Sequence, residues 1–537
     1  LHTDRLCKRI PKETKFLLAQ LPVKSSPFQK LILMEVIATV QSSDHFPIWV
    51  LFLSVAWVVV SIARFKLHPF LAMMSGAILV GLLSGPLPEP TVDNKGLFHN
   101  RVDLEETTAP YSNFSLAVKW SLLGFGNTAG GIGLIIALAA IVGTCMMKSG
   151  AAERVVRHLL SIFGEKRAGL VLLLSGFLLS IPVFFDTVFF LLIPLARAMA
   201  IRAGARYLYF VMAMAGAGAI THSMVPPTPG PLMIAEFLKI ELGYALMAGL
   251  LASLPLAALV LWMAGWFEKK YSFPMREVAG IGNKDLEDTL AKDSNELPPL
   301  FLSYLPILLP VVLISCISLL KVLGGQGVEL GSLSPEMDNV NFRILSFFGE
   351  PNIAMSLAAL VSISLLIRQE RPVGSEEKLP LSRILEAPLI TAGSIILITG
   401  AGGAYGGMIR LSGVGEVIAH YAVQLDFSYV LLAWGITAFV RIAQGSATVA
   451  MITGAGLMAS ILGDGSSLPY HPVYIFLAIG FGSITLSWMN DSGFWVVQKL
   501  SGFTEKEMLR TWSVLLTAIS LAGVVLSFFG SSLFPFR

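Results

Sequence analysis

The chain has 537 residues, of which 55% are hydrophobic and only 14% are charged, with a mean hydropathy of +0.73. Soluble proteins carry charge on about 25% of their residues, so this composition excludes a soluble protein and predicts roughly ten or more membrane crossings at ~20 residues each. The net charge is only +3 and no basic stripe alternates with aromatic residues, so we expect a lipid bilayer and no nucleic acid as partner.

The first 45 residues differ from the rest of the chain. They carry seven Lys or Arg against four Asp or Glu, with no apolar run long enough to span a membrane. They also lack the basic start, apolar stretch and cleavage site of a signal peptide. We interpret residues 1–45 as a basic extension outside the membrane core, either a genuine tail or the product of a misplaced translation start.

Twelve apolar segments follow. Ten have the length of one crossing, whereas 168–196 and 428–462 are too long and each predicts two short helices joined by a break, in a hairpin that enters and leaves on one side. The twelve segments are 46–63, 68–85, 129–147, 168–196, 207–225, 243–266, 299–320, 352–367, 384–409, 428–462, 473–489 and 511–529.

Two patterns predict that the second half of the chain is an inverted copy of the first. Identical residues recur at a constant offset of 263 positions, although Gly and Leu dominate these pairs. The segment 148–167 carries five Lys or Arg, and its partner 411–430 carries none. Because cytoplasmic loops collect Lys and Arg, equivalent loops are expected on opposite sides. The identities are Gly143/Gly406, Ser149/Ser412, Gly150/Gly413, Glu153/Glu416, Gly230/Gly493 and Leu246/Leu509.

The predicted fold is therefore an all-α polytopic membrane protein with two inverted repeats, each of about five transmembrane helices plus one re-entrant hairpin, as in many transporters. We assign residues 46–266 to the first repeat, 267–298 to a charged cytoplasmic linker and 299–529 to the second repeat. Residues 530–537 form a C-terminal tail.

Four polar or proline-rich breaks interrupt the apolar segments, at 181–187, 222–231, 444–448 and 490–493. At the offset of 263 the first coincides with the third and the second with the fourth. Inside lipid, a helix is broken where the freed backbone groups line a cavity or bind something. We therefore expect all four breaks near one central site, with broken-helix N-termini that suit a carboxylate. The alternative is a helix that is kinked at the prolines but takes no part in binding.

Three titratable residues at the breaks are candidate proton carriers. Asp186 lies in an otherwise uncharged run, where a carboxylate costs ~2.5–3.5 kcal/mol on insertion scales. Asp491 lies at the fourth break and can share this role. His222 stands at the mouth of the proline break and is of a type that titrates near pH ~6.5. For each of the three, a purely structural role is the alternative.

Polar groups at the same breaks are candidate substrate contacts. Arg441 can form a forked bond with a substrate carboxylate or pair with a structural Asp. The hydroxyl residues can bond a polyol, although small hydroxyl residues in membrane helices more often pack helices. The expected contacts are Arg441, Ser446, Thr448, Pro227, Thr228, Gly230, Asn490 and Ser492.

Other motifs predict neither catalysis nor a cofactor. The glycine clusters at 124–129 and 400–407 are interpreted as sites of close helix packing, because no βαβ unit surrounds the first. The three cysteines show no metal or redox spacing, and no P-loop, HExxH or Cys/His cluster occurs. We expect no metal, no cofactor and no enzyme, and an ion gradient as the driving force.

Several strings of the sequence, in this order, resemble the gluconate permease family of the ion transporter superfamily over about residues 46–529. The resemblance implies proton-coupled uptake of gluconate or a related sugar acid across the bacterial inner membrane, with paired hairpins and a scaffold and transport domain. Thr228 stands where the family pattern has a histidine. The strings are GFGNTAGGIGLIIALAAIVG (124–143), SGAAERV (149–155), FFDTVFFLLIPL (184–195), THSMVPPTPGP (221–231), GAGGAYGGMIRLSGVGE (400–416), RIAQGSATVA (441–450), NDSGFW (490–495) and TWSV (511–514).

The sequence therefore predicts a secondary transporter, or permease, that imports gluconate or a related sugar acid by proton symport. A sodium-coupled carrier of a carboxylate, hydroxy acid or D-serine is the nearest alternative, because carbonyls at the same breaks can ligate Na⁺. A channel and an intramembrane enzyme are more remote. The oligomeric state is left open, with a homodimer as one expectation.

Overall fold

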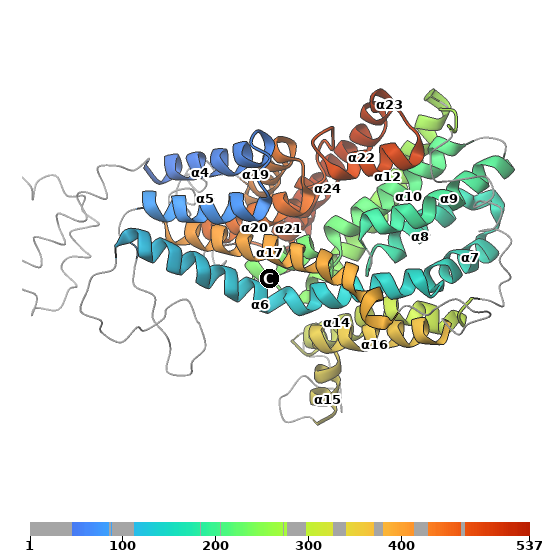
Figure 1. Ribbon diagram of the computed structural model, residues 1–537, viewed down its shortest axis with the longest axis horizontal. Helices are drawn as coiled ribbons and strands as arrows, with labels where there is room; N and C mark the ends of the chain where they lie inside the picture. The colour runs from blue at the N-terminus through green and yellow to red at the C-terminus, as the bar shows by residue number, and fades with distance from the viewer. Residues whose placement is uncertain are drawn as a thin grey trace, which may run out of the picture.

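In the computed structural model, all the regular secondary structure of the described residues is helical (Figure 1). The predictions made for residues 1–45, for most of the 411–430 loop and for much of the linker lie outside the described residues. Those described are 46–84, 87, 112–182, 184–203, 206–271, 273–276, 297–325, 340–369, 380–412, 428–462 and 468–536.

Seven of these helices are long and apolar enough to cross a membrane, which agrees with the predicted all-helical membrane protein. Shorter apolar helices accompany them. The helices are α4 (Phe46–Ala63), α5 (Pro69–Leu83), α6 (Asn113–Lys148), α7 (Ala151–Phe163), η1 (Glu165–Arg167), α8 (Ala168–Leu179), α9 (Phe185–Ala203), α10 (Tyr207–Met224), α11 (Pro229–Phe237), α12 (Leu242–Tyr271), α14 (Leu300–Gly325), α15 (Val340–Phe348), α16 (Pro351–Gln369), α17 (Leu381–Leu411), α19 (Tyr429–Gln444), α20 (Ala447–Leu462), α21 (Val473–Gly482), α22 (Ser492–Ser501), α23 (Glu505–Arg510) and α24 (Trp512–Leu533).

Two stretches that hydropathy did not predict are also helical. Helix α6 begins at Asn113, well before the apolar segment 129–147, with the Ser112 side chain accepting a hydrogen bond from the Ser115 N–H as its N-terminal cap. Its first half contains a lysine and several glycines, which lower its hydropathy. Helix α7 lies in the predicted loop 148–167 and buries one apolar face, so the charges there belong to an amphipathic helix.

The four predicted interruptions are all present. The segment 168–196 is divided between α8 and α9, and 428–462 is divided between α19 and α20 at Gly445–Ser446. Helix α10 ends before Pro226, because a proline lacks an N–H and clashes with the preceding turn, and α11 begins at Pro229, since a proline is tolerated in the first turn of a helix. Helix α21 ends at Gly482 and α22 begins at Ser492.

Helix bounds follow the predicted offset of 263 residues. Pro229 begins α11, and Ser492, which is 263 residues later, begins α22. Leu242 begins α12, and Glu505, at the same distance, begins α23. Helices α8, α9 and α10 correspond in the same way to α19, α20 and α21 within a few residues. These bounds support the predicted duplication, whereas the inversion and the domain boundaries stay predictions.

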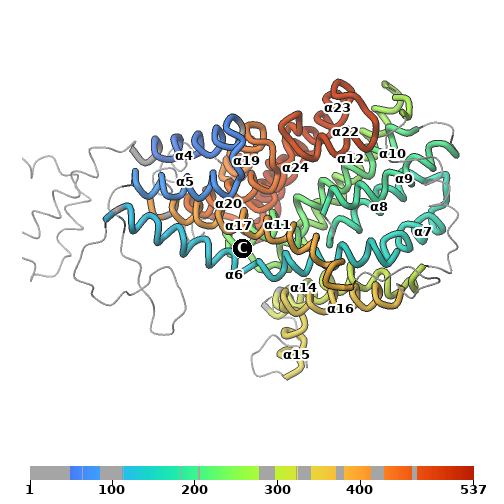
Figure 2. Tube along the Cα trace, in the orientation of Figure 1, coloured from blue at the N-terminus to red at the C-terminus, as the bar shows by residue number. Residues whose placement is uncertain are grey.

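Glycine allows α6 and α17 to lie backbone to backbone, side by side along much of their length (Figure 2). A Cβ atom at Gly124 would lie 2.9 Å from Ala404 Cα and 3.1 Å from the Gly403 carbonyl oxygen. A Cβ atom at Gly403 would lie 1.9 Å from Thr128 Oγ1. The two glycine clusters thus face each other and pack closely, as the sequence predicted.

An ion-paired network joins the segment 273–276, which follows α12, to the turn between α22 and α23. Arg276 donates to both carboxylate oxygens of Glu507 at 2.7 and 2.8 Å and to the Gly502 carbonyl oxygen at 3.1 Å. The Arg197 guanidinium donates to the Arg276 carbonyl oxygen at 2.6 Å. Glu507 also completes a capping box with Thr504 at the start of α23. The network therefore connects α9, the start of the linker and the second half of the chain.

We predict that Glu507→Gln lowers the free energy of unfolding by about 0.5–1 kcal/mol. Glutamine can keep the capping box but loses the charge, and the figure is modest because the Arg276 side chain is more than a third exposed. Thermal unfolding in detergent at a fixed scan rate measures the effect, with Glu505→Gln as a matched exposed control on the same helix. Equal melting temperatures for the two variants would contradict the prediction.

Candidate functional site

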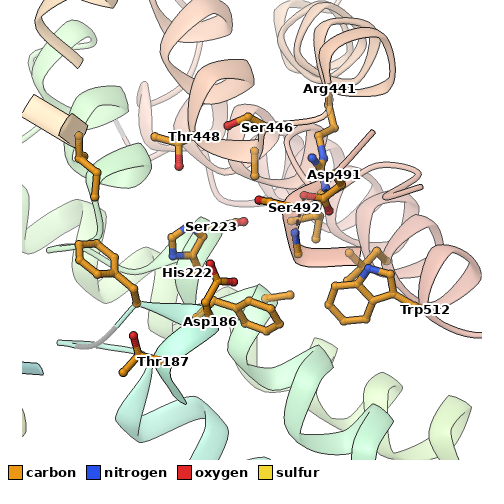
Figure 3. A pocket seen from close by; sticks show the side chains of 18 of the residues that line it. Asp186, Thr187, His222, Ser223, Arg441, Ser446, Thr448, Asp491, Ser492 and Trp512 are labelled. Carbon is orange, nitrogen blue, oxygen red and sulfur yellow. Dashed lines mark hydrogen bonds and ion pairs between the residues drawn. The ribbon is translucent and has the colours of Figure 1, made fainter. Parts of the chain in front are cut away.

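A cavity of about 300 Å³ lies where the four interruptions meet (Figure 3). The first interruption contributes Asp186 and its neighbours, and the end of α10 contributes His222 and Ser223. The third contributes Ser446–Thr448, and the fourth contributes Asp491–Gly493. Helices α17, α19 and α24 supply further lining residues. The fold therefore brings all four breaks to one cavity.

Three helices that follow a break begin at this cavity. The first turn of α9 carries Asp186, that of α20 carries Thr448 and that of α22 begins with Ser492, and all three residues line it. The first four N–H groups of a helix have no partner within the helix, and the N-terminus carries a partial positive charge. Such termini attract anions. The partial positive charges of these three helix N-termini thus suit a negatively charged solute.

A buried ion pair connects two of the interruptions. Arg441, near the end of α19, donates from Nη2 to Asp491 Oδ2 at 2.5 Å, and the two residues are only 3% and 7% exposed. Oδ2 also accepts the Ser487 hydroxyl, which in turn accepts from Trp512 Nε1 at 2.8 Å. Oδ1 accepts the Gly493 N–H at 3.0 Å and so caps α22. Both oxygens of Asp491 are therefore occupied.

The Arg441 guanidinium retains unused donors. Its Nε and Nη1 atoms are buried and have no hydrogen-bond partner within the described part of the chain. An unpaired buried donor costs about 1–3 kcal/mol, and more when it is charged. Since Arg441 lines the cavity, a ligand anion is the natural acceptor for these N–H groups.

Asp186 and His222 also line the cavity, as Figure 3 shows, and neither takes part in the ion pair of Arg441 and Asp491. His222 Nδ1 is buried without a partner among the described residues. The preceding Phe185 ring stacks on Trp512, with ring centroids 5.9 Å apart, which fixes the start of α9 against α24. Asp186 is thus held in place with its carboxyl group facing the cavity.

The hydroxyl residues divide into two groups. Ser446, Thr448 and Ser492 line the cavity, and the Ser446 hydroxyl also accepts the Val449 N–H at 3.3 Å. Thr228 does not line the cavity, because its hydroxyl donates to the carbonyl oxygens of His222 at 2.9 Å and Val225 at 2.7 Å. It stabilises the bend that follows α10.

Three other predicted contacts also lie outside the cavity lining. Pro227 lines a separate small space beside Pro182 and Phe184. At Gly230 an added Cβ would lie 2.0 Å from Met451 Cε, so this glycine allows α11 to approach α20. Asn490 donates to the Ile442 carbonyl oxygen at 2.9 Å. The assignment of Pro227, Gly230, Asn490 and Thr228 to the substrate stays a prediction. In the structure these four residues lie outside the lining of the cavity.

The sequence did not single out several residues of the site. Trp512 lies in the string TWSV, which marked it without a role, and it supports Ser487 and stacks on Phe185. Nothing in the pattern indicated Ser487, the second donor to Asp491. Thr391 of α17 lines the cavity from a helix that no break marks.

Gly445 fixes how the third interruption meets the fourth. Its φ of +94° lies in the left-handed region that glycine tolerates. An added Cβ would lie 2.2 Å from the Asn490 carbonyl oxygen. The hairpin of α19 and α20 therefore contacts the backbone of the α21–α22 interruption, and this contact places Arg441 and Asp491 side by side.

The family model of the GntP family permeases matches residues 116–533. The chain belongs to this family. It is 33% identical to a gluconate permease of Pseudomonas aeruginosa over 472 residues, which cover 87% of this chain and 93% of that protein. It is 32% identical to an uncharacterized permease of Haemophilus influenzae, with 87% and 88% covered.

A solved structure of similar fold belongs to MtrF of Neisseria gonorrhoeae, described as one of a class of antimetabolite efflux pumps. The match has a TM-score of 0.56 at 14% identity and covers 87% of this chain and 96% of MtrF. At this identity the likeness concerns the fold alone. The family and the apolar helices identify a multi-pass permease of the bacterial inner membrane.

We predict that Gly445→Ala lowers the free energy of unfolding by at least ~2 kcal/mol. A left-handed conformation costs a non-glycine residue about 1–2 kcal/mol, and the clash with Asn490 adds to this. Thermal unfolding in detergent is the measurement. Gly435→Ala is the matched control, because Gly435 lies within α19, which Gly445 ends, and an added Cβ there meets nothing within 4 Å, so this variant should not be destabilised. A normal melting temperature for Gly445→Ala would show that the left-handed bend is dispensable.

Proposed function

We propose that this permease imports gluconate or a closely related sugar acid by proton symport across the cytoplasmic membrane. The observation that carries the proposal is one cavity that combines three helix N-termini, a buried arginine with N–H groups that no described residue accepts, and a carboxyl group separate from its ion pair. The name of the 33% identical relative from Pseudomonas aeruginosa, a gluconate permease, supports the substrate class.

Arg441 is the proposed contact for the substrate carboxylate. Its Nε and Nη1 atoms, which no described residue pairs with, can donate to an anion while Nη2 keeps its bond to Asp491. Ser446, Thr448 and Ser492 can then exchange hydrogen bonds with the hydroxyl groups of a polyol chain. The cavity of about 300 Å³ is at the small end of ligand pockets, which are roughly 300–1,000 Å³. A short hydroxylated acid therefore fits its size and its polarity.

The charges in the cavity supply a physical reason for proton coupling. Its titratable and charged lining residues are Arg441, Asp491, Asp186 and His222. The paired Arg441 and Asp491 cancel, so with neutral His222 an ionised Asp186 makes the empty cavity negative and repels an anion. A proton on Asp186 removes this repulsion. Binding of the proton and binding of the substrate anion thus favour each other, which is the linkage that symport needs.

The function is tested by uptake of labelled gluconate into right-side-out membrane vesicles, with the pH gradient and the sodium gradient varied separately. We expect an inward proton gradient to drive accumulation, and Asp186→Asn to abolish it while leaving gluconate exchange between the two sides intact. The amide resembles the protonated carboxyl group, so the site still binds but no longer releases a proton.

The conservative Asp186→Glu is the control and should keep proton-driven accumulation. Accumulation by Asp186→Asn would show that another group carries the proton, and dependence on sodium instead of pH would support a sodium-coupled carrier. Passive equilibration without accumulation would indicate a channel, and chemical turnover of the solute would indicate an enzyme.

We further predict that Arg441→Lys weakens gluconate binding at least tenfold, because hydrogen bonds to charged groups contribute about 1.5–3 kcal/mol and an ammonium cannot supply the forked geometry. Isothermal titration calorimetry on the detergent-solubilised protein measures the Kd. Arg343→Lys on α15 makes the same change outside the cavity and should leave the Kd unchanged. An unaltered Kd in Arg441→Lys would remove Arg441 from the binding site.

A further inference from the structure

A second cavity, of about 290 Å³, adjoins the first. Phe184, Thr187 and Thr391 line both, so the two cavities share a wall. The second cavity also has two cationic side chains in its lining, Lys148 at the end of α6 and Arg383 near the start of α17. Both residues are exposed. The proposed function assigns no role to them.

The basic end of this second cavity lies at a segment that the sequence predicts to be cytoplasmic. Lys148 begins the segment 148–167, which also carries Arg154, Arg157, Lys166 and Arg167. Because loops rich in Lys and Arg stay on the cytoplasmic side, we assign the open side of the cavity to that face. The second cavity then lies between the central site and the cytoplasm.

The two cations have no counterparts in the other half of the chain. At the offset of 263, Lys148 corresponds to Leu411 and Arg383 corresponds to Trp120. The glycine of the same wall is kept, since Gly143 corresponds to Gly406. One glycine of the wall therefore recurs at the offset, whereas the two cations that line the cavity do not.

We propose that Lys148 and Arg383 form a second station for the substrate carboxylate, on the cytoplasmic side of the central site. This inference rests on the proposed function. An anion that leaves Arg441 on its way to the cytoplasm passes the shared wall of Phe184, Thr187 and Thr391 and meets two cations. The same cations attract the substrate when it approaches from the cytoplasm, so they set the affinity that the carrier presents on that face.

The test compares the KM for labelled gluconate in two kinds of membrane vesicle, whose proteins expose opposite faces to the medium. In inside-out vesicles we expect the double variant Lys148→Gln, Arg383→Gln to raise the KM about fivefold, since an exposed ionic contact contributes up to ~1 kcal/mol. In right-side-out vesicles the KM should change less than twofold. High salt should raise the wild-type KM in inside-out vesicles toward that of the variant, because salt screens exposed charges.

Lys506→Gln is the matched control, because it removes one exposed cation from the basic segment 499–510 without touching either cavity. The conservative Lys148→Arg, Arg383→Lys variant should keep the wild-type KM, which separates loss of charge from misfolding. Vesicles made from purified protein and phosphatidylcholine alone exclude an anionic lipid headgroup as the occupant.

An unchanged KM in inside-out vesicles, or an equal rise on both faces, would overturn the second station. A rise confined to right-side-out vesicles would overturn its cytoplasmic placement. Failure of the proposed function looks different, because the wild-type protein would then take up no gluconate in either kind of vesicle.

Discussion

The buried pair of Arg441 and Asp491 is the interaction on which the arrangement of the site depends. Removing two charges from water costs several kcal/mol for each ion, and their attraction offsets this only with good geometry and further hydrogen bonds. Asp491 obtains these bonds from Ser487 and from the N-terminus of α22. Arg441 does not, since two of its nitrogen atoms have no hydrogen-bond partner among the residues that the structure describes. The hydrogen bonds that the pair lacks are therefore those of Arg441, and an anionic ligand can accept them.

The same pair separates the tasks of the two carboxyl groups in the cavity. Asp491 is occupied at both oxygens and caps a helix, so a proton on it would weaken several bonds at once. Asp186 stands in the first turn of α9 and lines the cavity. A change in its charge alters the potential felt by a solute without dismantling the frame. This division supports Asp186 as the proposed proton carrier and Asp491 as the positioning partner of Arg441.

Most of the fold followed from hydropathy and from the residues that interrupt it. Prolines at 226, 227 and 229 and Gly445 marked the breaks correctly, because a helix in lipid has few ways to end. The first half of α6 was missed because its glycines and Lys119 lower its hydropathy, although α17 packs against it. The amphipathic α7 was missed because its charges resemble those of a loop.

The site itself was harder to predict than the fold. The sequence placed each break near the centre, but it did not indicate which end of a broken helix faces the cavity. At the proline break this is the end of α10, with His222 and Ser223, and Thr228 instead bonds to the backbone. Likewise, the charge of Asp491 was evident from the sequence, whereas its two occupied oxygens depend on Ser487 and Gly493 in three dimensions.

Comparison of the two halves shows that the helix breaks around the site recur in both, whereas the charged residues of the site do not. At the offset of 263, Asp186 corresponds to Val449, His222 to Thr485, Arg441 to Leu178 and Asp491 to Thr228. Every titratable or charged residue of the central cavity thus has an uncharged counterpart, while the breaks that carry these residues recur. A repeated frame with a single set of charges can offer one carboxylate site to both sides of a membrane. Two complete sets would instead place like charges together in the low-dielectric centre, where they repel strongly.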